Sequence, residues 1–326
     1  MSQVHVIGAA GFSGAQLAAL IDAHPHFDLG QVTARADAGK RIVDVAPEYR
    51  VDAVLQELDL EGVGQGDFAA VCYPHGEAAA MVSELVDRGA RVVDVSADHR
   101  LRDPGQYPHW YGFDHPRPDL VAEAVYGLPE INRDAITGAR VVANPGCYPT
   151  ASLLALLPMK GRICDIVIDA KSGVSGAGKT PTPDVHYSSV ADSVRAYQVL
   201  SHRHTPEIAQ EIGADVVFTP HLVPVDRGLL ASVYARFDGD APSQAQLTEA
   251  YMDFYDGHPF VEVVETPPGM HAVRNTNFAQ VCPMVDQASG RLIAFGVIDN
   301  LMKGAASQAV QNLNLMAGRP ETEGLR

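Results

Sequence analysis

A cysteine at the start of an apolar helix is the first residue of this sequence that could do covalent chemistry. The segment Asn144-Pro145-Gly146-Cys147-Tyr148-Pro149-Thr150 opens directly into an apolar run at 151–157 that predicts a helix. A helix N-terminus favours a thiolate and can hold an oxyanion. The flanking prolines and glycine expose the backbone, as a nucleophile entering a cleft requires. Cys147 is therefore predicted to be a nucleophile. The other three cysteines lie in or near apolar strands and are expected to be packing residues: Cys72, Cys164 and Cys282.

Two histidines, His202 and His204, could move protons. Thr205 is expected to cap a helix, with Pro206 at its first position and Glu207 in its first turn. The histidines are then predicted on a loop, where side chains can reach a cleft. Two histidines at positions i and i+2, without a nearby Asp or Cys ligand, are a poor zinc signature. General acid/base catalysis is therefore the preferred hypothesis for this pair.

The two histidines are not expected to share one role. Residues two apart outside a helix can point in opposite directions. One is therefore predicted to reach the reacting group, and His204 is expected to pack onto the first helical turn. The role of His221 is left open.

Three glycines near the N-terminus predict a dinucleotide site. Gly8, Gly11 and Gly14 lie between a β-branched run at 3–7 and an Ala- and Leu-rich helix at 15–23, with Phe12 and Ser13 in the same loop. Such a turn lets backbone N–H groups meet a pyrophosphate at a helix N-terminus. The spacing is G-x-x-G-x-x-G rather than the commoner G-x-G-x-x-G. A glycine turn that binds nothing is the alternative, but the strand-turn-helix context favours binding.

The end of the second predicted strand bears on the choice of cofactor. Arg35 lies closest to the strand end, with Thr33 and Lys40 nearby. Arginine suits a 2′-phosphate, whereas an acidic residue suits a free 2′-hydroxyl. NADP is therefore favoured over NAD, although Asp37 favours the opposite choice.

A second glycine-rich segment, Lys171 to Thr180, matches the letters of a P-loop through Gly173, Gly178 and Lys179. Pro181 and Pro183 would break the helix that must follow a P-loop, so a nucleotide triphosphatase is not expected. A flexible loop that brings its backbone near a nicotinamide is the preferred interpretation.

The elements that must position these residues alternate between strands and helices in the first half of the chain. This pattern predicts a Rossmann-like, doubly wound parallel sheet. The stretch from Arg102 to Pro129 is expected to be a long excursion over the surface. After Asn144 the pattern predicts a mixed α/β substrate and dimerisation domain. We expect a NADP-binding domain at 1–146, a catalytic domain at 147–298, and a C-terminal helix at 299–326 that returns to the first domain.

Composition restricts the function classes. The chain has 326 residues with 20% charged and 46% hydrophobic residues and a net charge of −16. These values fit a folded two-domain protein and argue against general binding to nucleic acid or anionic membranes. The four cysteines show neither metal-ligand nor disulfide spacing, and neither a signal peptide nor a membrane span is recognisable. A cytoplasmic homo-oligomer without a metal is expected.

Taken together, several segments resemble the N-acetyl-gamma-glutamyl-phosphate reductases, the arginine-biosynthetic members of the aspartate-semialdehyde dehydrogenase superfamily. The resemblance runs through nearly the whole chain. The segments that carry the resemblance are residues 8–14, 94–100, 126–130, 144–150, 171–179, 202–208, 218–224 with Arg227-Gly228, and 299–306.

The resemblance implies a reaction and roles for its residues. Cys147 would attack a γ-acyl phosphate to form a thioester, NADPH would reduce it to the semialdehyde, and His202 would be the acid/base. The glycine loop with Ser175 and Gly176 would bind NADP, and Asn300 would lie near the nicotinamide. Arg100 would bind a substrate anion, and His204 would contact the substrate.

Two other classes of function remain open from the sequence. A sister reductase acting on aspartyl phosphate, or on a carrier-linked aminoadipyl or glutamyl phosphate, would keep the same nucleophile and loops. A non-catalytic dinucleotide sensor would use Cys147 as a redox switch.

Overall fold

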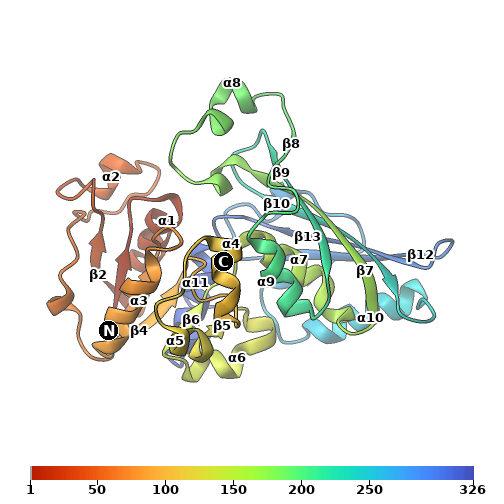
Figure 1. Ribbon diagram of the computed structural model, residues 1–326, viewed down its shortest axis with the longest axis horizontal. Coiled ribbons are helices and arrows are strands. Elements are labelled where there is room, and N and C mark those ends of the chain that lie inside the picture. The colour runs from red at the N-terminus through yellow and green to blue at the C-terminus, as the bar shows by residue number, and fades with distance from the viewer. Residues whose placement is uncertain (1) are drawn as a thin grey trace. The chain divides into compact units, whose positions relative to one another are not determined.

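The computed structural model describes residues 2–326, which form two compact units (Figure 1). Unit 1 contains the residues up to Pro145 together with Ala305–Arg326, and unit 2 is Gly146–Gly304. The predicted C-terminal segment at 299–326 is therefore divided between the units. Its first residues stay in unit 2 because the Asp299 carboxylate accepts the N–H of Asn275 at 2.8 Å and the Asn300 side chain accepts the N–H of Gly228 at 2.8 Å.

Unit 1 is built on a six-stranded sheet in the order β2-β1-β3-β4-β6-β5, and every neighbouring pair is parallel. The predicted doubly wound parallel sheet is confirmed. Its strands are β1 (Ser2–Ile7), β2 (Phe27–Thr33), β3 (Phe68–Val71), β4 (Arg91–Asp94), β5 (Val125–Tyr126) and β6 (Val141–Ala143).

Helices cover both faces of this sheet. On one face, α1 (Phe12–Asp22) and α11 (Ala306–Met316) enclose a core that includes Val6 and Val93. On the other, α3 (Ala78–Asp87) and α5 (Pro118–Glu123) enclose a core that includes Ile7. Adjacent strand residues thus alternate between two apolar cores, as a sheet buried on both faces requires.

The predicted surface excursion after Arg102 is wrong in one respect, because it contains structure and a core of its own. It holds α4 (Tyr107–Tyr111), α5 and β5, and α6 (Pro129–Gly138) follows. Tyr107 is fully buried, and its hydroxyl accepts the N–H of Leu101 at 3.2 Å. Aromatic rings supply enough apolar area for a short segment to bury a cluster without regular periodicity.

Unit 2 is built on a seven-stranded mixed sheet in the order β11-β12-β13-β10-β7-β9-β8, and it confirms the predicted mixed α/β domain. Its strands are β7 (Ile163–Gly173), β8 (Arg195–Ala196), β9 (Val216–Val223), β10 (Leu229–Phe237), β11 (Val261–Val263), β12 (Ala279–Asp286) and β13 (Arg291–Ile298). The β12–β13 hairpin was not predicted from the sequence. Two apolar runs separated by Gln287-Ala288-Ser289-Gly290 were the available signal.

Helix α7 (Cys147–Leu156) packs directly on this sheet. A Cβ added to Gly296 of β13 would lie 2.1 Å from the Ala151 carbonyl oxygen, so only glycine permits this approach. The remaining helices of unit 2 are α8 (Tyr187–Val190), α9 (His204–Ile212) and α10 (Gln244–Tyr255), and unit 1 also contains α2 (Ile42–Val45). Figure 1 shows α8 on a loop that extends away from the strands.

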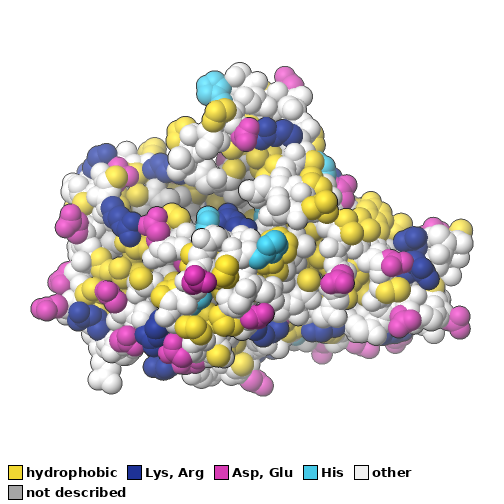
Figure 2. Space-filling model, in the orientation of Figure 1, with side chains coloured by type: hydrophobic (Ala, Val, Ile, Leu, Met, Phe, Trp, Pro, Cys, Tyr) yellow, Lys and Arg dark blue, Asp and Glu magenta, His cyan; other side chains and the backbone are white. Residues whose placement is uncertain are grey.

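Acidic and basic side chains are interspersed on the face of the molecule shown in Figure 2. Within residues 2–326, every helix is too short or too polar to cross a membrane.

Candidate active site

The predicted nucleophile, Cys147, is the first residue of α7. Gly146 precedes the helix in an extended conformation, with φ −70° and ψ 156°, and no side chain caps the helix N-terminus. Pro149 lacks an N–H, so the N–H groups of Cys147 and Tyr148 are the ones in the first turn that the helix itself does not use. Cys147 is half-buried, and a Cβ on Gly304 would lie 2.8 Å from the Cys147 Cβ.

Helix α9 holds the residue before the nucleophile from two sides. The fully buried Glu207 carboxylate accepts the Gly146 N–H at 2.9 Å. The His204 ring lies against the Gly146 Cα, because a Cβ added there would be 2.4 Å from His204 Nε2. From the sequence, Glu207 was expected only in the first turn of a helix. The i, i+3 spacing of these two residues, which places them on one helical face, was the signal available.

His202 is enclosed by aromatic rings. Its ring centroid lies 5.6 Å from that of Tyr148, 5.5 Å from that of Tyr197 and 5.3 Å from that of Phe218. Burial and, secondarily, the charge of Arg203 lower the pKa of His202 to about 4. His202 is therefore neutral near pH 7. Its Nδ1 accepts the His204 N–H at 3.1 Å, which leaves the proton of the neutral ring on Nε2.

The predicted cap at Thr205 is wrong, because α9 begins at His204, two residues before Pro206, the predicted first helical residue. The Thr205 N–H donates to the His202 carbonyl at 3.0 Å, and His202 Nδ1 takes the next N–H, that of His204. His202 thus performs the local hydrogen bonding that was expected of Thr205. The two histidine rings remain close, with centroids 4.7 Å apart.

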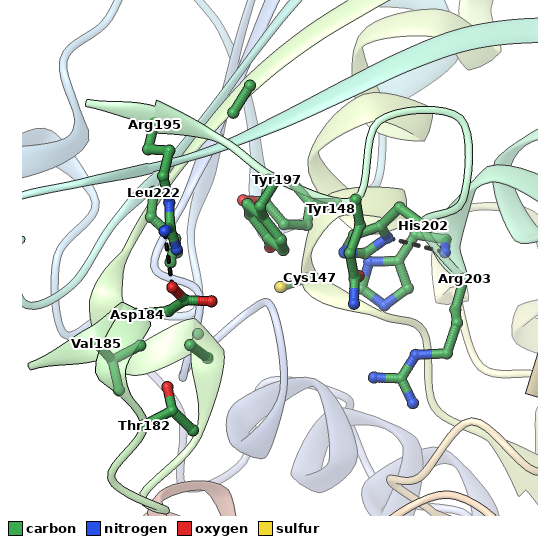
Figure 3. A pocket seen from close by; sticks show the side chains of 15 residues that line it. Cys147, Tyr148, Thr182, Asp184, Val185, Arg195, Tyr197, His202, Arg203 and Leu222 are labelled. Atoms are coloured by element: carbon green, nitrogen blue, oxygen red, sulfur yellow. Dashed lines mark hydrogen bonds and ion pairs between the residues drawn. The ribbon is translucent and has the colours of Figure 1, made fainter.

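Cys147, His202 and His204 line one cavity of about 600 Å³ within unit 2. Figure 3 shows the Cys147 sulfur between the Arg195–Asp184 pair on one side and His202 with Arg203 on the other. Arg195 Nη1 lies 2.8 Å from Asp184 Oδ1. The cavity therefore brings together a thiol, imidazole rings and two guanidinium groups, a set suited to an anionic substrate with a reactive carbonyl.

The predicted nicotinamide residues form a second network in unit 2. Asn300 Nδ2 donates to Ser175 Oγ at 3.0 Å, and Ser175 Oγ donates to the Asp226 carbonyl at 2.6 Å. A Cβ on Gly176 would lie 2.8 Å from Ser172 Oγ and 3.5 Å from Asn300 Nδ2. The structure thus brings Ser175, Gly176 and Asn300 together, and Gly176 also lines the cavity.

The P-loop interpretation fails on the structure of the same segment. Strand β7 runs into a short 3-10 helix, Val174–Ala177, and the next element is another 3-10 turn, Pro183–Val185. A P-loop needs an α-helix whose N-terminus faces the phosphates. The prolines prevent that helix from forming here.

His221 does not line this cavity, although the next residue, Leu222, does. Strand residues alternate between faces, so the His221 side chain lies on the other face of the sheet, where its Nδ1 is 3.0 Å from Asp169 Oδ1. Its carbonyl accepts the Tyr148 hydroxyl at 2.9 Å. His221 contributes to the site through its backbone.

The glycine loop of unit 1 has the local geometry that a dinucleotide pyrophosphate requires. Gly8 has φ +91°, and a Cβ on Gly14 would lie 2.3 Å from the Gly8 carbonyl oxygen. Gly11 precedes α1 in an extended conformation, and no side chain caps that helix. The first-turn N–H groups, including those of Phe12 and Ser13, have no carbonyl partner within the helix. These residues fit a bound diphosphate.

Thr33 shapes the loop from within. It is buried, its carbonyl accepts the N–H of Gly8 at 3.2 Å and that of Ala9 at 2.7 Å, and its hydroxyl lies 3.3 Å from the Gly8 nitrogen. Arg35, in contrast, is exposed. Its guanidinium lies 4.6 Å from the centre of the Tyr73 ring and is hydrogen-bonded to Glu77.

Asp37, the residue that favours NAD in the sequence, is paired with Lys40 at 2.8 Å. The charge of this carboxylate is therefore locally compensated. Arg35 is the cation that follows β2 most closely in the sequence.

Arg100 is buried in unit 1, where its Nε donates to the Asn144 carbonyl at 2.8 Å and an Nη donates to the Val95 carbonyl at 3.0 Å. Asn144 is itself fully buried, and its Nδ2 donates to the Ala305 carbonyl at 3.1 Å. Arg100 thus holds the backbone three residues before Cys147. For residues 2–326, the His, Cys, Asp and Glu side chains include no group of three placed to hold a metal ion.

Comparisons with known proteins agree with this arrangement. The family model of the semialdehyde dehydrogenase NAD binding domain matches residues 3–139, and that of the semialdehyde dehydrogenase dimerisation domain matches residues 147–300. Among solved structures, aspartate semialdehyde dehydrogenase II from Vibrio cholerae, complexed with ASA, has a TM-score of 0.73 at 19% identity, over 98% of both chains. The enzyme from Candida albicans with NADP has a TM-score of 0.72 at 16% identity, over 97% of this chain and 98% of that one. These likenesses establish the fold.

Sequence relatives establish the family. Proteins named N-acetyl-gamma-glutamyl-phosphate reductase from Dehalococcoides mccartyi and Desulforudis audaxviator are 47% and 45% identical to this chain. The alignments cover 98% and 100% of this chain and 96% and 98% of the relatives. The chain therefore belongs to the N-acetyl-gamma-glutamyl-phosphate reductase family of the semialdehyde dehydrogenases.

Proposed function

We propose that this protein reduces N-acetyl-gamma-glutamyl phosphate to N-acetylglutamate semialdehyde and phosphate with NADPH, a step of arginine biosynthesis. The names of relatives at up to 47% identity over nearly the full chain support the reaction. The observation that carries it in this chain is the position of Cys147, at an uncapped helix N-terminus beside a cavity lined by His202 and His204.

Cys147 supplies the covalent step. Its thiolate attacks the γ-carbonyl carbon, the new S–C bond forms, and the C–O bond to phosphate breaks with its electron pair leaving on the phosphate. The product on the enzyme is a thioester. A thioester carbonyl is electrophilic enough to accept hydride, so the covalent step leaves the acyl group in a form that can be reduced.

The cofactor is a nicotinamide nucleotide, and we propose NADP. The loop of Gly8, Gly11 and Gly14, with Phe12 and Ser13, would hold its diphosphate, and Arg35 would hold the 2′-phosphate, with Thr33 beneath the loop. Ser175, Gly176 and Asn300 are proposed for the nicotinamide end. When bound, NADPH supplies the hydride that reduces the thioester.

The chain's own groups then handle the developing charge. We propose that the N–H groups of Cys147 and Tyr148 at the start of α7 stabilise an oxyanion on the reacting carbon. His202, neutral with its proton on Nε2, is the proposed proton donor to that oxygen, and His204 is proposed to contact the substrate. Return of that proton to His202 re-forms the carbonyl, the C–S bond breaks with its electron pair leaving on Cys147 as the thiolate, and the semialdehyde is released.

The anionic groups of the proposed substrate, its phosphate and its α-carboxylate, need cationic partners in the protein. Arg195 and Arg203 line the cavity and are suited to the phosphate and the α-carboxylate. Arg100, the anion ligand expected from the resemblance, donates to two backbone carbonyls, and its contact with a substrate anion stays a prediction.

We also propose that the protein works as a homo-oligomer. The family model for residues 147–300 is that of a dimerisation domain. Directly paired residues form an apolar row across five strands of unit 2: Met284, Ile293, Tyr234, Val167 and Val217. Four of them are at least 37% exposed, so a second copy would bury them. The unbridged state of all four cysteines supports a reducing, cytoplasmic setting.

The test is a panel of semialdehydes, N-acetylglutamate, aspartate and N-acetylaminoadipate, each with NADP and phosphate. We expect phosphate-dependent formation of NADPH with N-acetylglutamate semialdehyde and much slower turnover with the other two. A preference for another semialdehyde would make this a sister reductase. NADP binding without turnover of any of the three would favour a sensor.

A further inference from the structure

We infer that Glu77 sets how tightly this protein holds the 2′-phosphate of its cofactor, by competing for the guanidinium of Arg35. The inference rests on the proposed use of NADP. It assigns to an acidic residue on α3 a role in cofactor discrimination, in addition to that of the arginine.

The residues concerned lie at the carboxyl ends of three neighbouring strands, in the order β2-β1-β3. Arg35 follows β2, Gly8 follows β1 and Tyr73 follows β3. A Cβ on Gly8 would lie 3.0 Å from Tyr73 Cδ1, and the Arg35 guanidinium lies 4.6 Å from the centre of the same ring. Tyr73 thus joins the glycine loop to Arg35, which places the guanidinium beside the site for the nucleotide.

Glu77 is available to Arg35 because another carboxylate caps its helix. Glu77 occupies the N-cap position of α3 but makes no side-chain capping bond. The fully buried Asp98 instead accepts the N–H groups of Gly76 at 2.9 Å, Ala78 at 3.1 Å and Ala79 at 3.0 Å. Because Asp98 accepts the N–H groups at the start of α3, the Glu77 carboxylate is not needed there and pairs with the Arg35 guanidinium.

Both partners are exposed, with side-chain exposures of 66% for Arg35 and 46% for Glu77, so the pair can open readily. A 2′-phosphate must take the guanidinium from Glu77 and then lie beside a carboxylate of like charge. A 2′-hydroxyl does not compete with Glu77 for the guanidinium and is not repelled by its charge. Glu77 therefore weakens binding of the phosphorylated nucleotide selectively.

The experiment measures binding alone, with the intact chain and two fragments of the cofactor. Calorimetric titration with 2′,5′-ADP and with 5′-AMP isolates the contribution of the 2′-phosphate. We expect Glu77→Gln to tighten 2′,5′-ADP binding about three- to tenfold at low salt and to leave 5′-AMP unchanged. Glu84→Gln is the matched control, because it removes the same charge from an exposed position on the same helix, and it should change neither affinity.

A second comparison ties the effect to Arg35. In an Arg35→Ala background, Glu77→Gln should tighten 2′,5′-ADP binding less, since no guanidinium remains to be released. The inference is overturned if Glu77→Gln leaves the ratio of the two affinities unchanged, or if it weakens 2′,5′-ADP, which would mean that Glu77 orients Arg35. If the unaltered protein itself binds both fragments equally, the NADP proposal fails and this inference fails with it.

Discussion

The N-termini of α1 and α7 are built alike but are suited to different tasks. Each helix is preceded by an extended glycine, Gly11 with φ −79° and ψ 165° and Gly146 with φ −70° and ψ 156°. Neither helix has a side-chain cap or an acidic residue in its first turn. Both helices therefore begin with N–H groups that no carbonyl of the same helix accepts, at the positive end of a helix dipole.

They differ in the residues around them. At α1 the neighbours are further glycines, and a Cβ on Gly14 would meet the backbone oxygen of Gly8. At α7 the first helical residue is Cys147, and the glycine before it is held by Glu207 and covered by His204. An open glycine turn suits a diffusible anion, whereas a turn clamped by side chains suits a nucleophile that must stay in place.

The strongest test of this contrast is Cys147→Ser. The variant should fold and bind NADP normally but lose turnover by about a thousandfold or more, because a serine at this position is a far weaker nucleophile. Turnover and NADP titration are measured on the same preparation. Iodoacetamide should inactivate the unaltered enzyme through Cys147. Inactivation that follows modification of Cys72 or Cys282 with Cys147 intact would refute the assignment.

The next largest effect is expected from the histidine pair beside α7. His202→Asn should lower kcat about a hundredfold, as expected for a lost proton donor, while His204→Asn should mainly alter KM or stability. Because the pKa of His202 is about 4, protonation should remove the Nδ1 acceptor and produce an acid limb near that pH, which His202→Asn abolishes. If His204→Asn abolishes the limb and His202→Asn keeps it, the roles are exchanged.

The low pKa of His202 also links the α7 site to stability. A histidine that titrates near 6.5 when unfolded and near 4 when folded stabilises the protein fully above pH 6.5. That contribution is lost as the pH falls through 4. In urea titrations, the free energy of unfolding of the His202→Asn variant should accordingly fall less between pH 6.5 and pH 4 than that of the unaltered protein.

At the α1 site, Arg35→Ala should raise the KM for NADP about ten- to a hundredfold and leave that for NAD nearly unchanged, because only the 2′-phosphate needs the guanidinium. Steady-state kinetics with both cofactors measure this. If Arg35→Ala raised the KM for NAD as much as the KM for NADP, Arg35 would shape the loop instead. Asp37 would then become the candidate ribose ligand.

The smallest expected effects come from adding one methyl group to each turn. Gly146→Ala should lower kcat about tenfold with NADP affinity unchanged, because the His204 ring must move. Gly14→Ala should weaken NADP about tenfold and leave the alkylation rate of Cys147 unchanged. If the two substitutions had the same effects on binding and turnover, the proposed division of labour between the two helix termini would be untenable.

Much of the fold could be predicted because its signals are local. The parallel sheet of unit 1 follows from β-branched runs alternating with helical segments, and its central strands bury both faces. The core around Tyr107 could not be predicted in this way, since its rings come together only when the chain between β4 and β6 closes on itself. The β12–β13 hairpin did carry a local signal, the short polar segment 287–290 between two apolar runs, but it was not predicted.

The sequence by itself was enough to propose residues for the chemistry: the Gly8–Gly14 loop, Cys147 after a glycine, and two nearby histidines. Their types and spacing within a few residues contain that information. Only the tertiary structure decided the partners of these residues. Glu207 reaches Gly146 across 61 positions of the chain, and Glu77 reaches Arg35 across 42. Side chains so far apart in sequence meet only through the packing of whole elements, which no local pattern records.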